Sequence, residues 1–194
     1  MMITNLRKVI GERLFGNSVS KDTSQMEPFL KQKDKIIDLG AGHCLYTKLL
    51  KDKGYDVQPV DIENSSYYPE IEVYIYDGEH LPFKDNEFDV CLLRSVLHHT
   101  TNPEVVLKEA VRVSKKLIIY ENVITNNIFQ RYSTYLMDCI MNKELIGGPH
   151  ANKTDKEWRL LFEKSELDLV NIIDRKAWFF LQDKIYFLKN LWKE

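Results

Sequence analysis

Short apolar segments alternate with amphipathic ones over the first two thirds of the chain. Five segments have the length and composition of β-strands: 35–39, 55–60, 73–76, 87–93 and 116–120. Apolar residues recur at helical spacing over 45–50 and 103–113, and Asn102, Pro103 and Glu104 form a typical helix start. Because strands and helices alternate, the pattern predicts a doubly wound α/β sheet that is mainly parallel.

The N-terminal region and the region after residue 121 carry different patterns. Residues 3–15 predict an amphipathic helix, and residues 16–25 predict a polar loop that leads to a short helix around 27–31. Residues 125–142 place apolar side chains on one side of a second, longer helix.

The C-terminal region predicts a helix and two strands. Thr154 and Glu157 form a capping box at the start of the helix, and strands are expected over 167–173 and about 179–188. Only residues 174–178 separate these strands, which is too few for a helical crossover, so the last two strands are expected to be antiparallel.

Composition excludes several classes of protein. The 27 basic and 29 acidic residues give a net charge of −2, without the basic excess of a nucleic-acid-binding protein. No apolar run reaches the ~18 residues of a membrane span, and no signal peptide is recognised, so we expect a cytoplasmic protein. Cys44, Cys91 and Cys139 are read as reduced thiols. The cysteines and histidines show no metal-ligand spacing, so no metal is predicted.

The segment 35–44 carries the first sign of a ligand site. An apolar strand that contains Asp38 ends at Gly40 and Gly42, and a helix follows. The N-terminus of that helix attracts negative groups, so the loop suits a ligand with a carboxylate or a phosphate. A dinucleotide-binding Gly-x-Gly-x-x-Gly sequence would place its third glycine at position 45, and Leu45 there disfavours a pyrophosphate.

Two further acids follow neighbouring strands. Asp61 ends the second strand and Asp77 the third, and ligands of open α/β sheets bind at these carboxyl ends. Asp61 is suited to ribose hydroxyls and Asp77 to an exocyclic amine such as that of adenine. Either residue alone is explained as well by a turn or a helix cap. Together with Asp38 and the glycine turn, they favour a nucleoside without a pyrophosphate, such as S-adenosylmethionine.

The segment 36–42 resembles the first motif of class I S-adenosylmethionine-dependent methyltransferases. Asp61 matches their acidic residue after the second strand. Four segments resemble the type 11 branch, which includes ubiquinone- and menaquinone-biosynthesis methyltransferases: 77–83, 87–90, 96–99 and 109–113. The resemblance covers about residues 34–121. It implies a Rossmann-like seven-stranded sheet, mainly parallel with an antiparallel last strand.

The expected architecture is a single methyltransferase domain over residues 1–194. Its four parts are an N-terminal helical segment, a cofactor-binding half, a helical insertion on the acceptor side, and a C-terminal helix with the antiparallel strand pair: 1–33, 34–121, 122–153 and 154–194. Four residues of the last two parts could line a substrate pocket: Tyr132, Tyr135, His150 and Trp178. Core packing is the better explanation for most of the four.

The cofactor residues that the resemblance implies follow the first four strands: Asp38, Gly40, Ala41, Gly42, Asp61, Ile62, Asp77, Gly78 and Arg94. The glycine loop would hold the methionine tail, with Asp38 orienting its amine and the Arg94 carbonyl lining it. Asp61 would bind the ribose and Ile62 would pack on the adenine. Asp77 and the Gly78 amide would bind the adenine edge.

Two departures from the family pattern stand out. Cys44 occupies the usual position of a third glycine, where the closest approach of a ligand is expected. Ser114, Lys115 and Lys116 replace the usual Lys-Pro-Gly-Gly turn before the fifth strand, away from the cofactor.

The predicted function is methyl transfer from S-adenosylmethionine to a small-molecule acceptor. Such a transfer depends mainly on holding donor and acceptor together, and it needs a base only when the acceptor loses a proton. His98, His99 and Glu121 are the catalytic candidates, although local packing explains the histidines equally well. One alternative is a non-catalytic cofactor-binding or partner subunit. Another is a nucleotide-dependent oxidoreductase, against which Leu45 argues.

Overall fold

The computed structural model describes residues 2–125, 128, 131–132, 136, 152–178 and 181–191. Within them the chain forms two compact units. The first unit comprises Met1–Leu92 with Arg112–Ser114, and the second comprises Leu93–Val111 with Lys115–Glu194.

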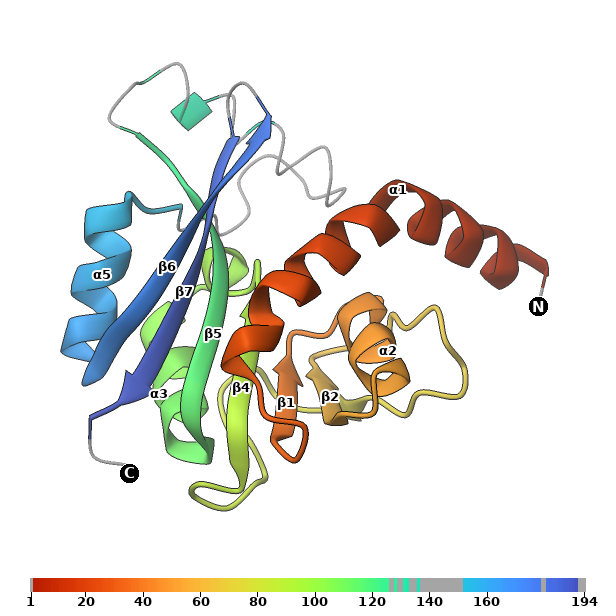
Figure 1. Cartoon of the computed structure of the whole chain (residues 1–194), viewed down its shortest axis with the longest axis horizontal. Helices are drawn as coiled ribbons and strands as arrows, with labels where there is room; N and C mark the ends of the chain where they lie inside the picture. Colours follow the sequence, from red (N-terminus) through yellow and green to blue (C-terminus); the bar gives the residue numbers. More distant parts are fainter. Residues whose placement is uncertain are drawn as a thin grey trace. The chain divides into compact units, whose positions relative to one another are not determined.

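The elements follow the predicted alternation, in this order: α1 (Met2–Met26), η1 (Glu27–Phe29), β1 (Lys35–Leu39), α2 (Leu45–Asp52), β2 (Asp56–Asp61), β3 (Tyr74–Ile75), β4 (Phe88–Arg94), η2 (Leu97–His99), α3 (Pro103–Val113), β5 (Ser114–Val123), α5 (Asp155–Lys164), β6 (Leu167–Trp178) and β7 (Leu181–Asn190). Hydrogen bonds join the strands into one sheet in the order β3-β2-β1-β4-β5-β7-β6 (Figure 1). Strand order reverses between β1 and β4, which is where ligands of open α/β sheets bind. The predicted Rossmann-like sheet is confirmed.

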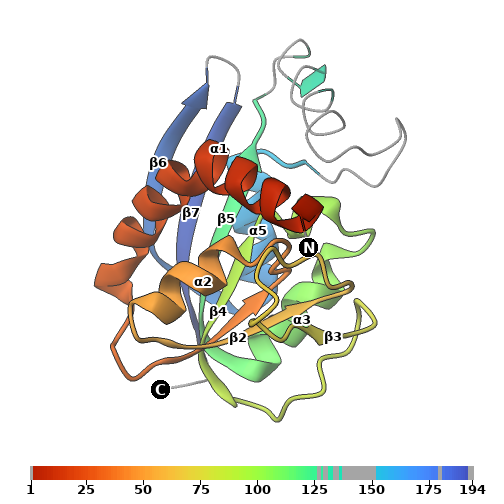
Figure 2. The same ribbon diagram turned by 90° about the vertical axis from the view of Figure 1, so that its right-hand side faces the viewer.

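The parallel strands of the first unit place their carboxyl ends at one edge. β1 pairs with β2 so that Leu39 lies opposite Val60, and β2 pairs with β3 so that Asp61 lies opposite Ile75. Helix α2 packs on β2 and on α1, and Figure 2 shows the two helices side by side. The loops that follow β1, β2 and β3 therefore begin close to one another.

The predicted polar loop over 16–25 is wrong, because α1 continues to Met26. Val19, Asp22, Thr23 and Met26 are buried at helical spacing, so this face of the helix packs on the unit. The Thr23 hydroxyl donates to the Val19 carbonyl at 2.8 Å, and the Tyr46 hydroxyl of α2 donates to Asp22 at 2.6 Å. These contacts outweigh the weak helix propensity of a polar segment.

The second unit contains the antiparallel part of the sheet. β7 pairs antiparallel with both β5 and β6, which confirms the predicted antiparallel pair. β6 extends to Trp178, however, so the predicted spacer over 174–178 is strand. Figure 1 shows β5, β7 and β6 side by side, with α5 packed along β6.

Helix α5 begins with the predicted capping box. The Thr154 hydroxyl accepts the Glu157 amide at 3.3 Å, and the Glu157 carboxylate accepts the Thr154 amide at 2.7 Å. Its buried face carries Trp158 and Phe162, whose rings stack at 6.2 Å, and the Phe162 ring meets Tyr186 of β7 edge-on at 5.1 Å. This aromatic group is a core of the second unit.

Two predictions fall largely on residues that the structure does not describe. The helix expected over 125–142 lies mostly outside the described residues, as do Tyr135, His150 and the side chain of Trp178. Tyr132 is described and is 69% exposed, so it is not a core residue. Among the described residues, no helix is long and apolar enough to cross a membrane.

Candidate functional site

The loop after β1 exposes bare backbone. Gly40 and Gly42 have φ angles of 76° and 50°, which glycine adopts without strain. The amides of Gly40 and Ala41 donate to the Val60 carbonyl of β2 at 2.8 and 3.1 Å. A Cβ atom added at position 42 would meet no atom within 4 Å, so the Gly42 backbone borders open space.

Cys44, directly before α2, adopts a conformation that favours glycine. Its φ of 60° and ψ of 26° are left-handed, which costs about 1–2 kcal/mol for a residue with a Cβ atom. Its side chain is fully buried with Tyr68, Ile71 and Val73, and this burial raises the pKa of the thiol. The loop therefore keeps its turn without a third glycine, and the side chain packs in an apolar cluster.

Asp61, the last residue of β2, binds the loop of β1. One oxygen of its carboxylate accepts a hydrogen bond from the Gly42 amide at 2.7 Å. The other oxygen accepts one from the amide of the next residue, Ile62, also at 2.7 Å. An ionised carboxylate offers about four lone-pair sites, so each oxygen keeps a site for a further donor. The structure thus brings together two residues that the sequence assigns to one ligand.

Ile62 and Gly78 also come together. Gly78 has a φ of 88°, and a Cβ atom there would lie 3.5 Å from the Ile62 Cγ2 atom. The Ile62 side chain is 63% exposed, which is unusual for a large apolar residue that follows a buried strand. An exposed apolar side chain beside a bare backbone offers a surface for a flat apolar group.

Asp77 stabilises the turn that contains Gly78. One of its carboxylate oxygens accepts the amides of His80 and Glu79, at 2.6 and 2.8 Å. These two backbone hydrogen bonds lower the pKa of Asp77, His80 being the larger cause. The side chain is nevertheless 60% exposed, and its second oxygen lies 3.5 Å from the Nδ1 atom of the exposed His80 side chain.

Asp38 lies inside β1, within the strand that the sequence predicts. Its side chain is 3% exposed, and it accepts the Thr47 hydroxyl of α2 at 2.5 Å. The sequence did not predict this contact. Thr47 shares the buried face of α2 with Tyr46 and Leu50, so a polar residue on that face was the available signal.

A second contact that the sequence missed ties the segment after β2 to the glycine loop. The rings of His43 and Tyr67 stack at a centroid distance of 4.1 Å and an angle of 12°. The Tyr67 amide donates to the His43 carbonyl at 3.2 Å, and the His43 Nδ1 atom lies 2.9 Å from the Ser65 carbonyl oxygen. Two aromatic residues 24 positions apart give no sequence signal for such a stack.

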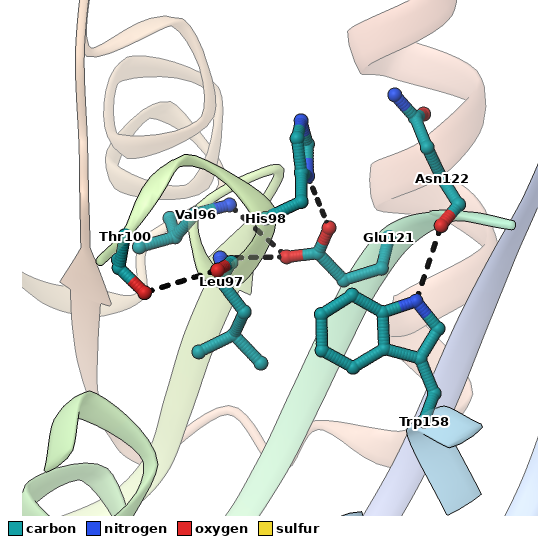
Figure 3. Close-up of polar contacts among 7 residues, drawn as sticks. All are labelled: Val96, Leu97, His98, Thr100, Glu121, Asn122 and Trp158. Carbon is teal, nitrogen blue, oxygen red and sulfur yellow. Dashed lines mark hydrogen bonds and ion pairs between the residues drawn. The ribbon is translucent and has the colours of Figure 1, made fainter. Parts of the chain in front are cut away.

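The three catalytic candidates meet in the second unit. Glu121 of β5 is fully buried, and its carboxylate accepts the amides of Val96 and Leu97 and contacts the His98 Nδ1 atom (Figure 3). The rings of His98 and His99 lie 4.0 Å apart at 44°. His98 is 1% exposed, whereas His99 is partly exposed.

Arg94, the last residue of β4, lies beside the same turn. Its guanidinium is 4.8 Å from the centroid of the Tyr120 ring, and the Tyr120 hydroxyl donates to Asp183 of β7 at 2.6 Å. Burial raises the pKa of the Asp183 carboxyl. Ser95, which follows Arg94, has a left-handed φ of 53°, and its amide donates to the Tyr120 carbonyl at 2.8 Å. The Arg94 carbonyl is thus part of a tightly held turn.

Comparison with known proteins identifies the family. Residues 37–117 match the family model described as a methyltransferase domain. Residues 37–117 are thus a class I S-adenosylmethionine-dependent methyltransferase domain. A domain of this family implies S-adenosylmethionine as the cofactor, as predicted.

Two curated relatives of this chain match less than half of it. An uncharacterised protein from Methanocaldococcus jannaschii is 35% identical over 85 residues, which are 43% of this chain and 41% of that protein. A demethylmenaquinone methyltransferase from Paenarthrobacter aurescens is 31% identical over 101 residues, which are 47% of this chain and 40% of that protein. The matches thus span about two fifths of the relatives' length.

A solved structure extends the likeness to the whole methyltransferase fold. A methyltransferase from Methanosarcina mazei superposes with a TM-score of 0.69 over 87% of this chain and 97% of that chain, at 20% identity. At this identity the likeness concerns the fold alone. The described residues contain no group of three histidine, cysteine or acidic side chains that could hold a metal ion.

The residues of the first unit fit the cofactor of the family. The open space at Gly42 leaves room for the methionine tail, and the Asp61 carboxylate beside it has lone pairs for the ribose hydroxyls. Ile62, exposed beside Gly78, offers an apolar surface for the adenine ring.

Proposed function

We propose that this methyltransferase transfers a methyl group from S-adenosylmethionine to a small-molecule acceptor. The observation that carries the proposal is the Asp61 carboxylate, which binds the Gly42 amide at 2.7 Å beside backbone that borders open space. A carboxylate beside open backbone suits a ligand with hydroxyl groups and a zwitterionic tail. The net charge of −2 supports a small molecule over a nucleic acid as acceptor.

The residues of the first unit would hold the cofactor from three sides. The loop of Gly40, Ala41 and Gly42 would bind the methionine tail, with Asp38 beneath the loop orienting its amine. Asp61 would bind both ribose hydroxyls.

The adenine would be recognised by the segments after β2 and β3. Ile62 would pack on the ring, and Asp77 with the Gly78 amide would bind its polar edge. The resemblance to the family assigns the Arg94 carbonyl to the methionine tail. When bound, S-adenosylmethionine supplies an electrophilic methyl group, and the protein's task is to hold and orient the reactants.

A calorimetric titration with S-adenosylhomocysteine tests the cofactor site. The wild-type protein should bind, and Asp61→Ala should weaken binding about 100-fold or more, because each hydrogen bond to a charged acceptor contributes about 1.5–3 kcal/mol. Asp56→Ala is the matched control, since it removes an exposed carboxylate from the other end of β2. Absence of binding by the wild-type protein would overturn the proposal.

Transfer itself is tested with S-adenosylmethionine that carries a tritiated methyl group. Incubation with fractionated pools of small metabolites should label at least one pool, and the Asp61→Ala protein should label none. Cofactor binding without transfer to any pool would favour the alternative of a non-catalytic cofactor-binding subunit.

A further inference from the structure

One buried carboxylate holds a complete turn of the second unit. Glu121 accepts the backbone amides of Val96 and Leu97 at 3.1 and 2.8 Å with one oxygen, and its other oxygen contacts the Nδ1 atom of His98 (Figure 3). The hydroxyl of Thr100 donates to the Leu97 carbonyl at 3.0 Å and fixes the other side of the turn. Glu121 is fully buried, so these donors replace water around its carboxylate.

These contacts indicate which ring nitrogen of His98 faces the carboxylate as a donor. A carboxylate that accepts two backbone amides serves as an acceptor, so the Nδ1 atom of His98 carries the hydrogen of the contact. Figure 3 shows the Nε2 atom on the side of the ring away from Glu121. A carboxylate that fixes the tautomer of a histidine is the usual way in which proteins orient an imidazole for proton transfer.

The two adjacent histidines nevertheless occupy different environments. His98 is 1% exposed and bound to Glu121, whereas His99 is partly exposed and stacks on His98 at 4.0 Å. A proton acceptor must reach the group from which it takes the proton. Of the three catalytic candidates, His99 is therefore the one whose side chain is not fully buried, although its Nδ1 atom is buried.

We infer that Glu121 and His98 are positioning residues and that His99 is the imidazole that meets the methyl acceptor. The inference rests on the proposed function and narrows its substrate class, because a base is useful only when the acceptor loses a proton. The acceptor therefore carries a hydrogen on its reacting group, as a hydroxyl or a neutral N–H group does. A thioether or a tertiary amine carries none and is excluded.

The step balances as follows. A lone pair of the acceptor forms the new bond to the methyl carbon, and the carbon–sulfur bond breaks with its electron pair left on sulfur. The hydrogen of the acceptor moves to a ring nitrogen of His99, which becomes an imidazolium. Glu121 contacts His98, whose ring lies 4.0 Å from the His99 ring, and its negative charge stabilises the imidazolium of His99.

Other charged groups surround this cluster and supply a control. Asp183 of β7 interacts electrostatically with His98, and also with Arg94 and Arg175. Asp183→Asn removes a buried carboxyl near His98 without touching its contact with Glu121. Comparing this variant with a Glu121 variant separates the effect of any nearby negative charge on His99 from the effect of the Glu121–His98 contact.

The first experiment is a pH titration of the histidine side chains by nitrogen NMR in the full-length protein. In the wild type, His98 should show the Nδ1–H tautomer, and the midpoint of the His99 titration is the reference value for the variants. In Glu121→Gln the midpoint of His99 should fall by about 0.5–1 pH unit, because a stabilising negative charge is lost. In Asp183→Asn the fall should be less than half as large.

Several outcomes of this titration would overturn the inference. They are an Nε2–H tautomer for His98 in the wild type, a His99 that does not titrate, and equal shifts in the two variants. If Glu121→Gln does not fold, the tautomer of His98 and the titration of His99 in the wild type still test the inference. His98→Asn is a second variant, in which the asparagine amide nitrogen can donate to Glu121 in place of the His98 Nδ1 atom. The turn should therefore remain folded in this variant although the imidazole ring is lost.

The second experiment identifies the class of acceptor from its product. Transfer of a deuterated methyl group to metabolite pools, followed by mass spectrometry, should give products that have lost one hydrogen for each methyl gained. A permanently cationic sulfonium or quaternary ammonium product would overturn the inference while leaving the proposed function intact. Failure of S-adenosylhomocysteine to bind would instead overturn the proposed function, and the histidine titration would be unaffected.

Discussion

The carboxylates in and after the strands have opposite environments in the two units. In the first unit, Asp61 is partly exposed and Asp77 is 60% exposed, and both accept amides of loops that follow strands. In the second unit, Glu121 is 0% and Asp183 is 6% exposed, and their donors come from neighbouring strands and turns. Exposed carboxylates keep lone pairs for a ligand, whereas buried ones are held by the fold. The difference separates groups that bind a ligand from groups that position others.

The largest expected effect is the loss of the Glu121 carboxylate. Glu121→Ala leaves two buried amides and His98 without their acceptor, and removing one partner of a buried charged network costs about 3–5 kcal/mol. Asp61→Ala, its exposed counterpart, should cost only about 0.5–2 kcal/mol, as loss of a capping residue does. Urea unfolding of both variants measures the difference. Equal costs would show that burial does not distinguish the two carboxylates.

The second prediction concerns the other buried carboxyl. Tyr120→Phe removes the hydroxyl that donates to Asp183 at 2.6 Å, and we expect a loss of about 1–2 kcal/mol near pH 7. Burial already raises the pKa of Asp183 and the hydroxyl opposes that rise, so the variant should raise this pKa further. A carboxyl whose pKa is raised by folding destabilises the protein as pH rises through that pKa.

The cost of Tyr120→Phe should therefore be larger at pH 7 than at pH 4. Urea unfolding at the two pH values measures it, and Tyr55→Phe, in the first unit, is the control. A cost independent of pH would mean that Asp183 is not the group affected.

The sequence predicts well what depends on local pattern. Apolar segments gave the strands, and the turn between Gly40 and Gly42 followed from the residue types alone. The contact of Asp61 with Gly42 was also within reach, because parallel strands end at one edge of the sheet. The full length of α1 could not be predicted, because Asp22 is stabilised by Tyr46, which lies 24 residues further along the chain.

The Glu121 cluster shows why the rest of the site escapes prediction. Glu121 and His98 are 23 residues apart, and their contact depends on the register of β5 against the turn after β4. In the sequence, His98 and His99 are equivalent, and only the structure separates a buried histidine from an exposed one. The sequence alone does not distinguish a buried acidic residue from an exposed one at the end of an apolar strand.

The third prediction tests whether the open backbone of the first unit is used. Gly42→Ala and Gly54→Ala both place a Cβ atom on a residue with positive φ, so each should lose about 1–2 kcal/mol of stability. Only Gly42 borders the proposed ligand space, whereas a Cβ atom at Gly54 would meet the Gln32 side chain. Gly42→Ala should therefore weaken S-adenosylhomocysteine binding about tenfold, or roughly 1.4 kcal/mol, by calorimetry. Equal affinities of the two variants would place the methionine tail elsewhere.

The smallest expected effect concerns Asp77, whose pKa is lowered by the amides of His80 and Glu79. A carboxyl whose pKa is lowered by folding stabilises the protein fully above its ordinary pKa of about 4, and this contribution is lost as pH falls through the lower, folded value. Asp77→Asn should therefore be slightly less stable than the wild type at pH 7, and the difference measured by urea unfolding should shrink as pH falls below that ordinary value. Asp56→Asn controls for loss of an exposed charge. If the Asp77→Asn protein also binds S-adenosylhomocysteine as tightly as the wild type, Asp77 supports the turn alone, and Asp61 is left as the exposed carboxylate that serves the ligand.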